Sequence, residues 1–303
     1  MLISLHNRYT LPDAPGLGAL DHVITYVPSL DLFLDSTAPY APFGILPAGE
    51  YDKPVVLTHP TAAKLVRTPA MLEGTIGLVT HTTARIGDDD MISGQTTTTA
   101  SGPQSIALRS MAAWFEGRGP AYSASSQLQN LGTPGTGRFT FDPPENPQGD
   151  YRVEGRFVLD EPLADRGTAG FVLPNGLGVF ERPGRALLGA ATHEEGGHSC
   201  YPGREVEEIE LELPAGASVA KLPQGMDLYK GGASYVSTYR VTDGVVHARR
   251  EFKVETGTQF CGEAQYAPMR DVLDAAKRDQ QAQIKLIRTE EQKVAHVPAS
   301  AAD

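Results

Sequence analysis

The sequence of 303 residues is long enough to bury a hydrophobic core and, by length, to form about two domains. Apolar residues make up 40% of it and charged residues 21%, as in globular proteins, which excludes wholesale disorder. A formal net charge of −11 argues against nucleic acid or anionic lipid as partners. We find no apolar run long enough for a membrane span and no signal peptide in residues 1–20.

Glycine and proline recur between short β-branched runs, a pattern typical of strands joined by turns. Near the beginning of the chain it predicts strands at residues 2–5, 22–27, 32–34 and 55–57. The link Pro28-Ser29-Leu30-Asp31 is short, so the two middle strands are expected to form an antiparallel hairpin.

Beyond a domain boundary near residues 66–74, strands alternate with a few helices. Strands are predicted at 80–86, 92–100, 151–159, 206–213, 235–242 and 245–254, and helices from Pro103, from Pro120 to Leu131, and from Pro268 to about Leu286. The last two strands flank Asp243-Gly244, a pair that tolerates positive φ.

The predicted fold class is therefore mainly β with some α. Residues 71–286 should form a β-sandwich-like domain with two short internal helices and a C-terminal helix, and residues 287–303 a frayed tail.

A histidine and an aspartate flank the predicted hairpin. His22 opens the first strand and Asp35 ends the second, so folding of the hairpin would bring them side by side. The aspartate could then accept a hydrogen bond from one imidazole nitrogen and leave the other to take the proton of a thiol. The same spacing also suits a purely structural histidine at a strand end.

The run DHVITYVPSLDLFLDSTAPYAPFGILP, residues 21–47, resembles the closing segment of the transglutaminase-like core in large bacterial envelope proteins. In that family a histidine on one strand and an aspartate in an LDPT-type strand end complete a catalytic triad. The resemblance makes His22 the general base and Asp35 its orienter, with Ser36 where the family often has proline. The rest of the chain, to the closing YAPMRDVLDAAKRDQQAQI, resembles the β-rich domain that follows this core.

The resemblance implies that residues 1–70 are the C-terminal remnant of a papain-like α+β core. The family chemistry is thiol attack on an amide or peptide carbonyl, as in a protease or an amide transferase. The resemblance also implies a peptide or protein substrate and a periplasmic or cell-envelope location. We expect neither a cofactor nor a metal.

The family's nucleophilic cysteine opens a helix well upstream of the histidine, because the positive end of the helix lowers the pKa of the thiol. Only 21 residues precede His22, and none is cysteine. We therefore expect this chain to be inactive by itself, and the upstream core to be a possible partner.

Cys200 and Cys261 are the only cysteines, and both lie far downstream in strand and turn segments. A structural disulfide or a pair of buried thiols is a better interpretation than a catalytic nucleophile. An oxidising envelope compartment favours the disulfide.

The run from His193 to His198 invites comparison with zinc proteases, but the spacing differs. That zinc motif places two histidines four residues apart on a helix, whereas these are five apart with two glycines between them. Adding Cys200 gives no recognised metal-binding spacing. We predict a loop with incidental histidines.

A second class of function fits the same sequence. The β-rich part could be a non-catalytic binding or scaffolding module of the bacterial envelope that holds a peptide, a glycan or a partner subunit. His22 and Asp35 would then be relics of an active site.

Overall fold

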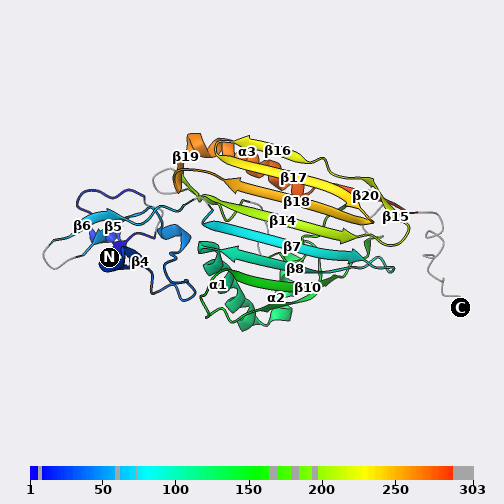
Figure 1. Cartoon of the computed structure of the whole chain (residues 1–303), viewed down its shortest axis with the longest axis horizontal. Helices are drawn as coiled ribbons and strands as arrows, with labels where there is room; N and C mark the ends of the chain where they lie inside the picture. The colour runs from blue at the N-terminus through cyan, green and yellow to red at the C-terminus, as the bar shows by residue number, and fades with distance from the viewer. Residues whose placement is uncertain are drawn as a thin grey trace.

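The computed structural model of the chain describes residues 1–5, 9–58, 62–72, 74–163, 170–178, 184–192 and 197–288. Across these segments the protein is mainly β with some α, as predicted, and a small N-terminal unit lies at one end of a large twisted sheet (Figure 1). Of the tail predicted at 287–303, residues 289–303 lie outside the described segments.

The N-terminal unit is a four-stranded sheet with an adjoining hairpin. The order in the sheet is β2 (His22–Val23), β1 (Leu2–Ile3), β5 (Pro54–Leu57) and β6 (Lys64–Arg67), with all neighbours antiparallel. The strand predicted at 22–27 is divided at Ile24, which is buried. The sequence pattern did not predict β6.

The predicted hairpin forms from β3 (Thr25–Val27) and β4 (Leu32–Leu34), with Val27 paired to Leu32. Its link is a 3-10 turn that ends at Asp31 in the left-handed conformation, with φ of 48°. The Tyr26 hydroxyl donates a hydrogen bond of 2.7 Å to the Asp31 carboxylate. The hairpin turns the chain so that the end of β4 comes back beside the start of β2.

The large sheet has eight strands. Their order is β16 (Met226–Lys230), β17 (Ala233–Thr242), β18 (Val245–Val254), β14 (Gly203–Glu212), β7 (Ile76–Ile86), β8 (Ile92–Ser101), β10 (Tyr151–Leu159) and β9 (Gly135–Phe141). Neighbours are antiparallel except β14 and β7, which are parallel. Asp243 and Gly244, both with positive φ, make the predicted tight turn between β17 and β18.

One face of this sheet is covered by a mixed layer, which gives the fold its sandwich character. The helices α1 (Pro103–Arg118) and α2 (Pro120–Asn130) pack at one end, beside a small sheet of β11 (Phe171–Val172), β20 (Gln283–Arg288) and β15 (Ala217–Lys221). The helix α3 (Glu263–Gln280) lies behind β16 and β17 (Figure 1). A second small sheet joins β12 (Leu188–Thr192), β13 (Gly197–Cys200) and β19 (Phe260–Gly262).

The C-terminal helix differs from the prediction. It begins at Glu263, so that Pro268 lies inside it, and it ends at Gln280, not near Leu286. The buried stripe of the helix starts before the proline and comprises Tyr266, Met269, Val272 and Ala276. Burial of these side chains outweighs the backbone hydrogen bond that Pro268 cannot donate. Leu286 belongs to β20, because the chain beyond Gln280 alternates apolar and polar residues and pairs with β11 and β15.

The chain passes from the small sheet to the large one between β6 and β7. The domain boundary expected near residues 66–74 stays a prediction. A single apolar core nevertheless continues across it, because Ile3, Ile24 and Val55 of the N-terminal unit belong to the same buried cluster as Ile76 and Tyr235 of the large sheet. The first unit therefore has no separate core of its own, and its geometry depends on the part that follows.

Candidate active site

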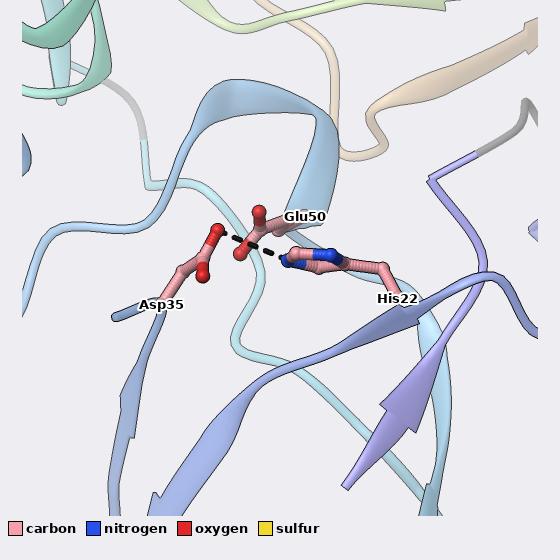
Figure 2. A group of neighbouring side chains, drawn as sticks. All are labelled: His22, Asp35 and Glu50. Atoms are coloured by element: carbon pink, nitrogen blue, oxygen red, sulfur yellow. Dashed lines mark hydrogen bonds and ion pairs between the residues drawn. The ribbon is translucent and has the colours of Figure 1, made fainter. Parts of the chain in front are cut away.

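The hairpin brings His22 and Asp35 together. Nε2 of His22 lies 3.1 Å from Oδ2 of Asp35. Figure 2 shows the two side chains converging from separate segments, His22 from the first residue of β2 and Asp35 from just after β4. The predicted proximity is confirmed, and the catalytic role remains a prediction.

The second oxygen of Asp35 is held by Thr37. Oδ1 accepts hydrogen bonds from the backbone N–H of Thr37 at 2.8 Å and from its hydroxyl at 2.7 Å. Burial raises the pKa of Asp35, but the hydrogen bonds from Thr37, Glu50 and His22 together outweigh it, so the pKa is lowered. The carboxylate is thus ionised and oriented, with one oxygen left to face the imidazole.

The other imidazole nitrogen is available. Within the described part of the chain, no residue forms a hydrogen bond with Nδ1 of His22, and the side chain is 16% exposed. When Nε2–H donates to Asp35, Nδ1 carries a lone pair that can accept a proton. This is the arrangement required of a general base with an orienting carboxylate.

Glu50 is the third member of the cluster, and sequence reasoning missed it. It ends the short 3-10 turn Ala48–Glu50 and is 2% exposed. The ligand atoms of His22, Asp35 and Glu50 all lie within 4.8 Å of one another (Figure 2). The only available signal was a carboxylate in a loop rich in proline and glycine shortly after Asp35, and no spacing rule connects the two.

The ionisation of Glu50 is strongly perturbed. Burial raises its pKa, the hydrogen bond and negative charge of Asp35 raise it further, and the ammonium of Lys53 lowers it, with a result of about 8. One of its oxygens, Oε2, is buried and has no hydrogen-bond partner among the described residues. Glu50 is therefore largely protonated at neutral pH.

Lys53 connects the cluster to the start of the chain. Its Nζ donates to the carbonyl oxygens of Ser4 at 2.8 Å and Leu5 at 3.3 Å, and its side chain is buried. It also lies over the ring of Tyr9, 5.1 Å from the ring centroid. These contacts hold a positive charge that interacts electrostatically with Glu50.

The cluster offers one nitrogen and two oxygen donors, and a small cation would fit these donor types. The buried ammonium of Lys53, which interacts electrostatically with Glu50, opposes a second positive charge there. The donor types would suit a cation, but the ammonium beside them opposes one, and the sequence-based expectation of neither metal nor cofactor stays a prediction.

The two cysteines form the predicted disulfide. Cys200 at the end of β13 is bonded to Cys261 in β19, with Cα atoms 5.9 Å apart and both side chains fully buried. Neither residue has a free thiol. The bond is compatible with an oxidising compartment.

Part of the histidine-rich run, residues 193–196, lies outside the described segments. His198 is described: its Nε2 lies 2.9 Å from the Glu263 carboxylate, and its ring stacks on Tyr266 with centroids 3.7 Å apart. These contacts connect β13 to the beginning of α3. Among the described residues His198 joins no cluster of possible metal ligands.

Comparisons with known proteins add little. No family model matches the chain, and no curated protein matches it. A variant of a two-domain M1 zinc metallopeptidase bound to L-arginine is a weakly similar solved structure, with 11% identity and a TM-score of 0.15 over 61% of this chain and 44% of that one. The chain thus spans less than half of that structure's length, and a TM-score this low supports no argument about fold or function. In the described part of the chain, no helix has both the length and the apolar character to cross a membrane.

Proposed function

We propose that this chain carries the histidine and aspartate of a transglutaminase-like cysteine active site, with His22 as general base and Asp35 as its orienter. The observation that supports this best is the 3.1 Å contact between Nε2 and Oδ2. Thr37 holds the second carboxylate oxygen, and Nδ1 remains available for a proton. The resemblance of residues 21–47 to the family's closing segment points to the same pair.

The chemistry would begin with transfer of the cysteine thiol proton to Nδ1 of His22. The thiolate then attacks the carbonyl carbon of an amide, and the imidazolium returns the proton to the leaving nitrogen as the C–N bond breaks. A thioester remains. Water or a second amine attacks the thioester with His22 again as base, which releases an acid or a new amide and restores the thiol.

The nucleophile must come from outside these 303 residues. The sequence contains two cysteines, and they are bonded to each other. In the family that the sequence resembles, the cysteine opens a helix upstream of the histidine. The proposed enzyme is therefore this chain together with such an upstream segment, acting on peptides or proteins. The disulfide supports an oxidising location such as the periplasm or the cell envelope.

The test is an amidase and transamidase assay of the chain combined with the polypeptide encoded directly upstream. Activity should fall by about 10³-fold or more in His22→Ala and in Asp35→Asn, as when a member of a catalytic triad is removed. Asp88→Asn is a matched control, because Asp88 is exposed in the turn between β7 and β8. Full activity in His22→Ala, or an upstream segment without cysteine, would refute the proposal.

The second candidate is a binding module, and one feature of the large sheet favours it. The sheet face opposite the helices has a hollow of about 380 Å³ whose lining includes the polar and charged side chains of His81, Glu208, Arg240 and His247. If this is the functional surface, peptide or glycan binding should be lost in Arg240→Ala and unchanged in His22→Ala. Binding that is lost in His22→Ala and unchanged in Arg240→Ala would eliminate this candidate.

A further inference from the structure

We propose that Glu50 is a positioning residue that donates a hydrogen bond from its protonated carboxyl to Asp35 and so keeps Asp35 directed at His22. Its catalytic meaning rests on the function proposed above. The hydrogen bond itself is a property of this chain and can be tested without activity.

Geometry brings the two carboxyl groups into one small space. One polar side-chain atom from each of Glu50, Asp35 and His22 lies within 4.8 Å of the other two, and Glu50 is almost completely buried. Two carboxylates this close in a poorly solvated site cannot both be ionised without a large energetic cost. One of them therefore holds a proton, which is available for a hydrogen bond to the other.

The surroundings decide which group holds the proton. Asp35 accepts two hydrogen bonds from Thr37 and faces His22, and all of these favour its ionised form. The carboxyl of Glu50 is less well supplied with donors, because its buried Oε2 has no hydrogen-bond partner among the described residues. The pKa values agree, because that of Asp35 is lowered and that of Glu50 is raised to about 8.

The remaining ionisable groups around Glu50 do not change this assignment. The charge of Lys53 lowers the pKa of Glu50, but burial and Asp35 have the larger combined effect. The Lys53 ammonium is also engaged by the backbone carbonyls of Ser4 and Leu5. The hydroxyl of Tyr51, whose pKa is raised by burial, stays neutral in the range where Glu50 ionises.

The arrangement has a consequence for pH. While Glu50 is protonated, the site has one carboxylate, and it is held from two sides by Thr37 and Glu50. When Glu50 loses its proton, the hydrogen bond to Asp35 is replaced by repulsion between like charges. The contact between Asp35 and His22 should then loosen as the pH rises through about 8.

Nitrogen-15 NMR of the histidine rings in the full 303-residue chain tests this inference, with the His22 signals assigned by their absence in His22→Ala. In the wild type, we expect the neutral His22 ring to carry its proton on Nε2, and its signals to show a step near pH 8. Glu50→Gln should keep this tautomer and lose the step, because an amide donates a hydrogen bond but does not ionise. Glu50→Ala should show a mixture of the two tautomers wherever the His22 ring is neutral.

A step near pH 8 that persists in Glu50→Gln, or no step in the wild type, would overturn the inference. The comparison of wild type with Glu50→Gln decides it even if the alanine variant does not fold. Either result leaves the proposed function intact, because that proposal depends on the activity of the His22 and Asp35 variants.

Discussion

The guanidinium of Arg250 on β18 donates a hydrogen bond of 2.7 Å to the carboxylate of Glu207 on the neighbouring strand β14. Arg250 is buried and also donates to the hydroxyl of Tyr239. That hydroxyl and the one of Tyr235 both donate to Asp279 near the end of α3. A buried polar network therefore connects the helix α3 to the covered face of the large sheet.

Arg250 forms ion pairs with Glu207 at 2.7 Å and with Asp279 at 3.5 Å. Arg250→Met should destabilise the protein by about 3–5 kcal/mol, because it leaves both carboxylates without their cationic partner. Arg249→Met is the matched control, since the adjacent Arg249 makes its ion pairs with Glu208 and Glu251 on the open face and should cost about 1 kcal/mol or less. Urea denaturation, monitored by circular dichroism, measures the free energy of unfolding of both variants. An equal decrease in the free energy of unfolding in the two variants would show that the buried network contributes no more to stability than the ion pairs of the open face.

Breaking the disulfide should also destabilise the fold. Cys200 and Cys261 are separated by 61 residues, and closing a loop of this length stabilises the folded state by about 4 kcal/mol on the chain-entropy model. We expect Cys200→Ala/Cys261→Ala to lower the free energy of unfolding by up to this amount. Wild-type protein in excess reductant is the control, and it should match the double variant. An unchanged urea midpoint in both would contradict this prediction.

Stability should fall as the solution becomes alkaline. The pKa values of Glu50 and Glu205 are raised from 4.5 to about 8 and about 7, in both cases chiefly by burial. A raised pKa means that the folded state binds the proton more tightly, so the stabilising contribution is complete below pH 4.5 and is lost as the pH rises to 7 or 8. Each pKa unit corresponds to about 1.4 kcal/mol.

The matched comparison is wild type against Glu50→Gln in urea melts at pH 5.5, 7 and 8.5. Between pH 5.5 and the Glu50 pKa of about 8, the wild type should lose on the order of 1.4 kcal/mol more than the variant for each pH unit. The variant should keep the smaller dependence that comes from Glu205. Parallel pH profiles would mean that Glu50 titrates normally in the fold.

Local chemistry was enough to predict several of these features. The pair Asp243-Gly244 specified a tight turn, and the short link from Pro28 to Asp31 specified the hairpin that places Asp35 beside His22. In each case the relevant residues are close in sequence, so turn geometry and strand alternation determine the outcome.

Contacts between distant segments could not be predicted in this way. Lys53 reaches the carbonyl of Ser4, 49 residues away, and Glu50 reaches the cluster from a loop whose path no periodicity defines. The strand β20 alternates apolar and polar residues over only a few positions directly after a helix, and its pairing partners, β11 and β15, lie far from it in the chain. Such contacts depend on tertiary packing, which a single sequence pattern does not encode.

The last prediction concerns catalysis by this chain without a partner. It should show no thiol-dependent amidase or transamidase activity, because its cysteines are buried in a disulfide and the base His22 has no thiol to deprotonate. The assay is hydrolysis of a library of glutamine-containing and general peptides, with and without a reductant that opens the disulfide. Cys200→Ala and Cys261→Ala should behave like the wild type, with folding checked by circular dichroism. Turnover that appears on reduction and disappears in one of these variants would make that cysteine the nucleophile and would refute the assignment of an external thiol.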